Sequence, residues 1–465
     1  MTRKIATFTV GVLIMLTGTM GGCGTRVAFS DPGLAQAVAQ HLGVKTDSFG
    51  AVAVAKITEL DASNRGIASL DGISALKSLQ ALNLDGNQLT DIQPLVDANL
   101  PNLKQVSVAA NPLPVSLDSA VYSEVRTLRQ RGVIVDWLSS FVAPMGHHSF
   151  ITDMVQAPDG SLVAINDSQL FHVNLLGKDA WSDPSPGPAY SRLANIVRAD
   201  ELVLGNSRAL DEYGPWEYSF RSWGELDSNQ QFHYPNGVYR MTAAPDGRYL
   251  LVGLPFKDED SAMVVKLNED NKEAWSGFYR DEGGGMSGIA LPNGYAIVCK
   301  KGLIQLDSEG KKVKTVNLAT YGVEKVWSPK MVQTQDGYAI MGSPAGHQEA
   351  RVLVTLTIGL AVNKVIQIPV PNSPGDYSMV YDFDATEDGG FILAVHNWAF
   401  PETSADGLLV KIDGTGKVLW SRSYKDYALG FVLETADGGF AAGAYDKNWT
   451  TYIIKTDING LVDEQ

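Results

Sequence analysis

Cysteine is scarce in this chain of 465 residues, which contains only Cys23 and Cys299. Two cysteines exclude a framework of several disulfides and any cysteine-rich zinc module. Basic residues are also too few for a nucleic-acid-binding surface, because 37 Lys and Arg face 52 Asp and Glu and the net charge is −15. Charged residues make up only 19% and hydrophobic residues 45%, so the chain is not disordered and can bury a core.

Catalytic signatures are missing as well. The sequence has no Gly-x-Ser-x-Gly, no His-Glu-x-x-His and no phosphate loop. His147 and His148 are adjacent, and neighbouring residues on a strand point to opposite faces, so they are not expected to chelate a metal together. Cys299 lies in an apolar run and is expected to be a small buried residue. We therefore expect no metal, no cofactor and no catalytic residue.

The N-terminus reads as a secretory signal. Arg3 and Lys4 precede an apolar run at 5–16 that is too short to span a membrane, and no later stretch approaches the ~20 apolar residues of a spanning helix. The following segment, Thr19-Met20-Gly21-Gly22-Cys23, resembles a bacterial lipobox. The resemblance implies cleavage before Cys23 and lipidation, including a palmitoyl chain, at that residue.

An ordinary signal peptide that happens to contain a cysteine is the alternative. With lipidation, residues 1–22 are the leader, residues 23–30 a linker to the anchor, and the location is the bacterial cell envelope. Gly24 after the cysteine resembles lipoproteins sorted to the outer membrane of Gram-negative cells.

Residues 31–138 carry a repeat with a leucine-rich template. The Leu-x-Leu pair of each copy places alternate side chains of a short strand in the core, and the asparagine turns the chain. Helices at 31–43 and 119–131 are expected to cap the stack, followed by a strand at 133–137. These copies resemble the internalin-like repeats of bacterial surface proteins. The best copy is Leu79-x-x-Leu82-x-Leu84-x-x-Asn87-x-Leu89, with a second at 103–113 and an imperfect one at 57–67.

A second repeat occupies residues 139–465. Each unit begins with an Asp-Gly-type turn and an apolar strand, and continues with a strand, a turn and an outer strand. The turn residues fall at 159, 200, 246, 293, 336, 388 and 437, with separations of 41 to 52 residues, a period typical of propeller blades. Trp181, Trp275 and Trp420 occupy one equivalent place and are expected to dock between adjacent units.

These units resemble the "DGGF…VKxDxxGxxxW" propeller repeats of bacterial extracytoplasmic proteins and, less closely, the tryptophan-docking repeats of quinoproteins. The predicted fold is mostly β, with a short leucine-rich repeat solenoid followed by a seven-bladed β-propeller. Closure of the ring is ambiguous. Residues 461–465 look like a short outer strand of the last unit, and residues 132–141 fit either that place or the last leucine-rich repeat strand, which we favour.

Four residues are candidate ligand-binding residues. Trp398 and Trp449 are expected in equivalent loops of the sixth and seventh units, where exposed aromatic rims grip a partner, although packing explains them about as well. Asp382 and Asp384 lie near an inner strand. For these two residues, a solvent-exposed position on the segment that leads into a turn is the simpler interpretation.

The leading hypothesis is a lipid-anchored, monomeric envelope protein without catalysis, which binds a protein or glycan partner through both modules. It contacts the membrane through lipid on Cys23 and binds no nucleic acid. The alternatives are a polysaccharide-active enzyme with carboxylates in the propeller funnel, and a scaffold for outer-membrane protein assembly. The sequence does not identify the ligand.

Overall fold

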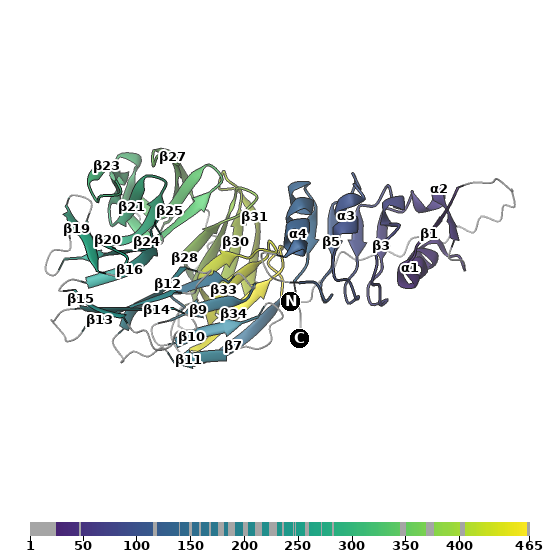
Figure 1. The fold of residues 1–465 in the computed structure, drawn as a ribbon, viewed down its shortest axis with the longest axis horizontal. Helices are drawn as coiled ribbons and strands as arrows, with labels where there is room; N and C mark the ends of the chain where they lie inside the picture. Colours follow the sequence, from purple (N-terminus) through teal and green to yellow (C-terminus); the bar gives the residue numbers. More distant parts are fainter. Residues whose placement is uncertain are drawn as a thin grey trace.

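A computed structural model shows an elongated molecule in which a narrow repeat unit extends from one side of a larger β domain (Figure 1). No helix within the part of the chain described below is long and apolar enough to cross a membrane. The described residues are 25–45, 48–114, 119–138, 140–147, 151–157, 160–166, 169–174, 181–184, 191–198, 203–209, 216–222, 230–234, 237–244, 246, 248–255, 260–270, 272–280, 283–344, 350–368, 376–399 and 405–462.

The repeat unit is built on a parallel sheet of very short strands in the order β3-β4-β5-β6. Their central residues, Leu60, Leu82, Val106 and Val135, stand opposite one another in one row and are buried. The elements of this unit are β1 (Arg26–Ala28), α1 (Pro32–Leu42), β2 (Ser48–Gly50), α2 (Ala51–Val54), β3 (Glu59–Asp61), η1 (Ile73–Ala75), β4 (Ala81–Asn83), α3 (Gln93–Asp97), β5 (Gln105–Ser107), α4 (Ala120–Gln130) and β6 (Ile134–Asp136).

The repeat asparagine binds the turns of two successive repeats. The buried side chain of Asn87 accepts hydrogen bonds from the backbone N–H groups of Arg65 and Ile67, both at 3.0 Å. Its amide nitrogen donates to the carbonyls of Ala62 at 2.9 Å and Leu84 at 2.7 Å. An amide group can accept and donate at once, which explains why this turn takes asparagine.

Both predicted capping helices are present. Asp31 caps α1 by accepting hydrogen bonds from the N–H groups of Gly33 and Leu34. Ser119 caps α4 by accepting from the N–H of Tyr122. The strand predicted after α4 is β6, which pairs in parallel with β5 and confirms that residues 134–136 end the repeat sheet.

The described part of the β domain contains seven four-stranded antiparallel sheets. We number them one to seven by the chain order of their innermost strands, which are β8, β12, β16, β20, β24, β28 and β32 and are called the first strands below. Sheet one holds β8 (Asp153–Gln156), β9 (Leu162–Ile165), β10 (Gln169–Val173) and β11 (Trp181–Pro184), and sheet two holds β12 (Ser191–Arg198), β13 (Val203–Ala209), β14 (Trp216–Ser222) and β15 (Gln230–Tyr234). Sheet three holds β16 (Gly237–Ala243), β17 (Tyr249–Leu254), β18 (Ala262–Leu267) and β19 (Glu273–Tyr279), and sheet four holds β20 (Gly285–Leu291), β21 (Gly294–Cys299), β22 (Gly302–Leu306) and β23 (Lys312–Asn317).

A short helix, η2 (Leu318–Tyr321), connects sheets four and five. Sheet five holds β24 (Val323–Thr334), β25 (Gly337–Pro344), β26 (Val352–Thr357) and β27 (Val362–Gln367), and sheet six holds β28 (Asp376–Ala385), β29 (Phe391–Ala399), β30 (Ala405–Ile412) and β31 (Val418–Tyr424). Sheet seven holds β32 (Ala428–Glu434), β33 (Phe440–Tyr445), β34 (Thr450–Thr456) and β7 (Phe141–His147). Cys299 in β21 is fully buried, as expected.

The outer strand of sheet seven comes from the start of the β domain and not from its end. β7 pairs antiparallel with β34, and Phe141 stands opposite Lys455. The expectation of an outer strand at 461–465 is therefore wrong: Leu461 and Val462 form no strand, and residues 463–465 lie outside the described part. β7 begins five residues after β6 ends, so the chain passes directly from the repeat sheet to the outer edge of sheet seven. The C-terminal residues are therefore not required to complete this sheet.

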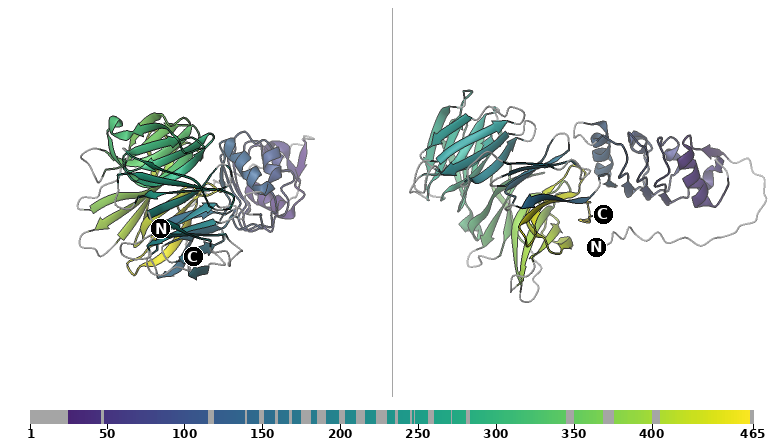
Figure 2. Two further views of the ribbon diagram at one scale, coloured as in Figure 1. Left: turned by 60° about the vertical axis from the view of Figure 1, so that its left-hand side comes forward. Right: turned by 90° about the horizontal axis from the view of Figure 1, so that it is seen from below.

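The first strands of successive sheets neighbour one another, and β32 of the last sheet also neighbours β8 of the first. The sheets therefore surround a common centre in a propeller-like arrangement, seen from two further directions in Figure 2. We call this part the propeller-like domain. Tryptophans join some of its sheets.

Trp275 of sheet three reaches sheet four, where its Nε1 donates to the Ser308 carbonyl at 3.2 Å. Trp420 of sheet six meets Phe440 of sheet seven with ring centroids 5.6 Å apart. Docking between units is thus confirmed for these two tryptophans. The side chain of Trp181 lies outside the described part.

The repeat unit is fixed to the propeller-like domain through α4. Arg129 donates to the carbonyl of Ala436 at 2.8 Å, in the turn between β32 and β33. Arg126 lies 3.7 Å from Glu387, in the equivalent turn of sheet six. Together with the short passage from β6 to β7, these contacts hold the two parts together on the side of the domain where the Asp-Gly turns lie.

Candidate functional site

Asp382 lies on the innermost strand of sheet six and is buried, so the expected solvated position near a turn is wrong for this residue. Its Oδ2 is 3.1 Å from Lys330 Nζ on β24 and accepts a hydrogen bond from the N–H of Val432 on β32 at 3.0 Å. Lys330 also donates to the Val432 carbonyl at 3.0 Å and lies 4.5 Å from the ring centre of Phe431. The pair thus joins the first strands of sheets five, six and seven.

Asp384 repeats this contact two residues further along β28. Its Oδ2 accepts from the N–H of Glu434 at 3.1 Å, and Glu434 in turn accepts from the N–H of Glu387 at 2.7 Å. The first strand of each sheet pairs with another strand on one side only, so the backbone groups on its other edge face the centre of the domain. Carboxylates that accept from this edge satisfy backbone groups that would otherwise lack partners.

The charges of this inner cluster are strongly perturbed. Burial raises the pKa of Asp382 and of Asp384, and the Lys330 ammonium opposes the rise in both. Burial also raises the pKa of Glu434 to about 8, and the nearby charge of Asp384 adds to this. Burial alone would lower the pKa of Lys330, but Asp382 and Asp384 outweigh it and raise that pKa. One ammonium therefore serves more than one carboxyl group, and Glu434 keeps its proton to a higher pH than an ordinary glutamate.

Trp449 occupies the turn between β33 and β34 and is 53% exposed. Its ring lies parallel to that of Tyr445, with an interplanar angle of 5° and centroids 5.2 Å apart. Trp398, in contrast, lies within β29, where its backbone pairs with Ala405, so the two tryptophans do not occupy equivalent loops. The Trp398 side chain lies outside the described part.

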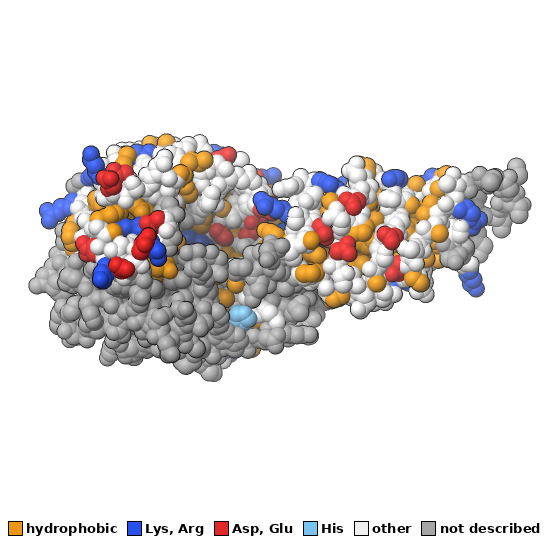
Figure 3. All heavy atoms as spheres, viewed as in Figure 1, with side chains coloured by type: hydrophobic (Ala, Val, Ile, Leu, Met, Phe, Trp, Pro, Cys, Tyr) orange, Lys and Arg blue, Asp and Glu red, His pale blue; other side chains and the backbone are white. Residues whose placement is uncertain are grey.

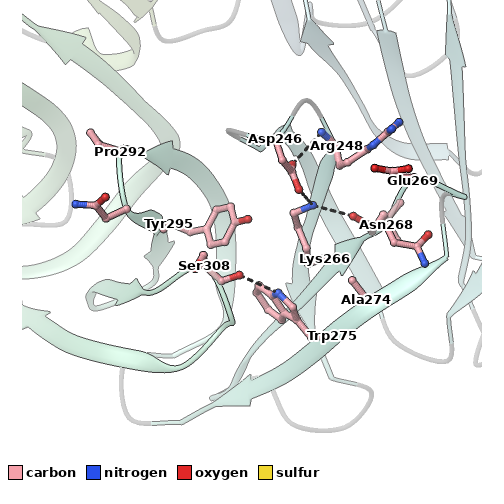
Figure 4. A pocket seen from close by; sticks show the side chains of 13 residues that line it. Asp246, Arg248, Lys266, Asn268, Glu269, Ala274, Trp275, Pro292, Tyr295 and Ser308 are labelled. Atoms are coloured by element: carbon pink, nitrogen blue, oxygen red, sulfur yellow. Dashed lines mark hydrogen bonds and ion pairs between the residues drawn. The ribbon is translucent and has the colours of Figure 1, made fainter.

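A groove of about 580 Å³ separates sheets three and four on the side of the Asp-Gly turns (Figure 4). Trp275 and Tyr295 line one part of it with tilted rings 6.0 Å apart, and the pair of Lys266 and Asp246, 2.8 Å apart, lines another. Burial opposes the charge of Asp246, but Lys266 more than compensates and lowers the pKa of that carboxyl. The lining therefore combines two aromatic rings with charged groups, namely the Lys266–Asp246 pair, Arg248 and Glu269.

The lysine of that pair belongs to a recurring feature that sequence reasoning missed. Lys411 lies 2.9 Å from Asp388, and Lys455 lies 2.7 Å from Asp437. Each of these lysines also donates to the carbonyl of the next residue. The lysine of the "VKxD" pattern therefore anchors the Asp-Gly turn of its own sheet. A lysine follows the Asp-Gly turn by 18 to 23 residues in units three, six and seven, and this recurrence was the available signal.

The aspartate of the same pattern closes the following turn. Asp413 accepts from the N–H groups of Thr415 at 2.8 Å and Lys417 at 3.0 Å. Asp307 and Asp457 make the same pair of contacts in sheets four and seven. Within the described residues no group of three or more His, Cys, Asp and Glu is placed to hold a metal ion.

The outward face of the repeat sheet is open to solvent. One row contains Glu59, Gln105 and Ile134, which are exposed, and Ile134 is 40% exposed although it is apolar. The next row begins with Asp61 and ends with Asp136. Figure 3 shows carboxylate and apolar side chains mixed on the visible face of the repeat unit, with Lys and Arg mainly at its border. Cys23, the predicted lipidation site, lies outside the described part.

Comparison with known proteins finds a family match in the repeat unit and structural similarities in both parts of the chain. The sequence profile of the family "Leucine Rich repeats (2 copies)" matches residues 56–97. An internalin C2 from Listeria monocytogenes is 30% identical, with a TM-score of 0.20, over 23% of this chain and 44% of the internalin. The Pan2 WD40 domain of Neurospora crassa is 10% identical over 69% of this chain and 92% of that domain, with a TM-score of 0.39. The AfRom2 CNH domain is 12% identical over 68% of this chain and 99% of that domain, with a TM-score of 0.38.

The observed sheets and the family match together define a mostly β protein that joins leucine-rich repeats to a propeller-like domain. Less than half of the internalin is spanned by this chain. Repeats of this type present an extended face to other proteins, which suggests a role in protein binding.

Proposed function

We propose that the protein is a non-catalytic lipoprotein of the bacterial cell envelope that binds other macromolecules. Residues 1–22 form the leader, Cys23 carries the lipid, and residues 23–30 link it to leucine-rich repeats at 31–138. Residues 139–465 form a closed seven-bladed propeller, in which β7 completes the last blade. In a Gram-negative cell the anchor lies in the outer membrane. The protein is a monomer and binds no nucleic acid.

One observation carries the binding role. The repeat unit is attached to the propeller-like domain by α4, through Arg129 and Arg126, while the outward face of its sheet stays exposed. A rigid attachment presents this face at low entropic cost to a partner. An exposed Ile134 among polar residues gives that face an apolar contact point of the kind that protein partners bury. The similarity to an internalin supports a protein as this partner.

The same reasoning supports a role without catalysis. The oxygens of Asp382 and Asp384 accept hydrogen bonds from the backbone of β32, and Asp382 also pairs with Lys330. Groups that hold strands together in this way are poorly suited to move towards a substrate. We therefore assign these candidate residues to the stability of the propeller.

In-cell photo-crosslinking tests the binding role. A photoreactive residue placed at Gln105 or at Ile134, on the exposed sheet face, is expected to yield the same discrete crosslinked partner. Val313, which is 58% exposed on the outer strand of sheet four, is the matched control position and is expected to yield none. Equal crosslinking from all three positions, or none from Gln105 and Ile134, would contradict the proposal. An outer-membrane protein as the partner would indicate the assembly scaffold.

An enzyme acting on polysaccharide is the second candidate. The observation that favours it is the position of Glu434, whose backbone N–H donates to Asp384 and whose carboxyl group has a pKa raised by burial, because paired carboxyl groups with different proton affinities occur in glycoside hydrolysis. Incubation of the purified protein with envelope polysaccharide distinguishes the two candidates. Release of reducing ends that is lost in Glu434→Gln would favour the enzyme.

A further inference from the structure

The turn that carries Trp449 has the geometry of a glycine turn. Asp446 accepts from the N–H groups of Asn448 and Thr450, both at 2.9 Å, and the N–H of Trp449 donates to the Asp446 carbonyl at 3.0 Å. The turn at Asp413 has the same three contacts and places Gly416 in the fourth position, with φ of 92°. Trp449 has φ of 61° at that position, in the left-handed region where a side chain is unfavourable.

Burial does not compensate for this strain. Leu360 also occupies the fourth position of such a turn, with φ of 58°, but its side chain is completely buried in the core between sheets four and five. Trp449 has the same backbone strain and leaves 53% of its surface exposed. Strain that the fold does not need is commonly retained where a function uses it.

The exposed ring rests on a rigid base. Tyr445, beneath it, is 6% exposed and meets His396 edge to face, with ring centroids 6.0 Å apart. His396 is 1% exposed and packs in turn against Tyr381, at 5.6 Å. Burial lowers the pKa of His396 to about 4, so its imidazole is uncharged at physiological pH. The indole of Trp449 is therefore held in one orientation by a stack that reaches into the core.

The surroundings of the ring favour one class of ligand. Lys447 and Asn448, in the same turn, are exposed, and Asp446 is partly exposed. A cationic ligand would meet the Lys447 ammonium, and an apolar peptide side chain would meet a single flat ring flanked in the same turn by polar residues. A pyranose ring has C–H groups on one face, which pack on an indole, and hydroxyl groups at its rim, which bind amide, carboxylate and ammonium groups.

We propose that Trp449 is a stacking platform for a pyranose ring of a neutral carbohydrate. The assignment rests on the proposed binding role and narrows one surface of the propeller-like domain to glycan. It is separate from the exposed sheet face of the repeat unit, to which we assign a protein partner.

Calorimetric titration of the purified mature protein with cellotetraose and with the N-acetylglucosamine tetramer, each up to about 10 mM, tests the platform. Binding of at least one sugar is expected, weakened roughly tenfold or more in Trp449→Gly and changed by less than about threefold in Trp449→Phe. Phe278→Ala removes an equally exposed aromatic side chain from the outer strand of sheet three and is expected to change nothing.

The melting temperature separates binding from packing. Glycine fits this backbone, so Trp449→Gly is expected to lower the melting temperature by less than about 2 °C or to raise it. A fall of more than about 5 °C would show that Trp449 serves packing and would overturn the proposal. Absence of binding to both sugars, or equal binding by Trp449→Gly, would overturn it as well. If sugar binding fails in this way while crosslinks from Gln105 and Ile134 persist, only the carbohydrate platform is refuted. If those crosslinks are absent while sugar binding is intact, only the protein-binding face is refuted.

Discussion

Replacement of Asp382 with alanine tests whether this carboxylate holds the propeller-like domain together. Its side chain is only 6% exposed and contacts both Lys330 Nζ and the Val432 N–H. Removal of one partner from a buried ion pair costs about 3–5 kcal/mol. Lys330 keeps the Val432 carbonyl and the ring of Phe431 as partners, so we expect a loss near the lower end, about 3 kcal/mol, in the free energy of unfolding.

Urea unfolding of the mature chain, followed by tryptophan fluorescence and by circular dichroism, measures this loss. Asp382→Asn keeps an acceptor for the Val432 N–H but loses the charge, and is expected to fall between wild type and Asp382→Ala. Asp336→Ala is the matched control, because Asp336 is exposed in a turn of sheet five, and a change within about 0.5 kcal/mol is expected. A stability of Asp382→Ala equal to that of the control would refute the structural assignment.

Four further substitutions probe other parts of the molecule. Asn87→Ala removes five backbone hydrogen bonds and should destabilise the repeat unit by at least about 3 kcal/mol, read as faster hydrogen exchange in β3–β5. Unchanged exchange would contradict this. Arg129→Ala should lower the free energy of unfolding by about 1.5–3 kcal/mol and speed hydrogen exchange in α4 and in the Ala436 turn. Arg126→Ala loses only an exposed ion pair and should lower it by about 0–1 kcal/mol. Equal effects of the two substitutions would refute the role of Arg129 at the junction. Glu434 has a pKa of about 8 in the folded protein, above its ordinary value of 4.5, so its stabilisation is complete below pH 4.5 and is lost as the pH rises through 8. Glu434→Gln should remove this decline, which one proton limits to ~1.4 kcal/mol per pH unit, and an unchanged pH profile would contradict the assignment.

Repetition made most of the architecture predictable. The spacing of leucines and asparagines around Asn87 predicted the repeat strands, because each position has one geometric role that recurs at a fixed interval. The Asp-Gly turns predicted antiparallel units for the same reason. Trp275 and Trp420 predicted contacts between units because a large ring at an equivalent place in several repeats needs an equivalent surface.

Features that depend on contacts between distant segments could not be predicted. The partners of Asp382 are Lys330 and Val432, 52 and 50 residues away on the equivalent strands of the neighbouring sheets. The side chains at these positions differ from unit to unit, so the repeat pattern does not predict the contact. The contact of Arg129 with Ala436 spans 307 residues. The outer strand of the last sheet was misassigned because 461–465 follows in sequence, whereas β7 reaches that edge from the other end of the domain.

The candidate site was only partly predictable. Trp449 was identified as an aromatic residue in a loop, but its left-handed backbone and its stack on Tyr445 depend on the three-dimensional turn. A signal did exist in the sequence: Asp446-Lys447-Asn448-Trp449 has the spacing of the Asp-x-x-Gly turns, with tryptophan in place of glycine. Departure from a repeat at one position is therefore as informative as the repeat itself.

The intact mass of the mature protein extracted from membranes is the decisive measurement, because the anchor fixes where the protein meets its partners. We expect a chain that begins at Cys23 and carries a diacylglyceryl group, with or without a further acyl chain. A chain that begins elsewhere, or an unmodified Cys23 in protein released to the medium, would refute lipid anchoring at Cys23.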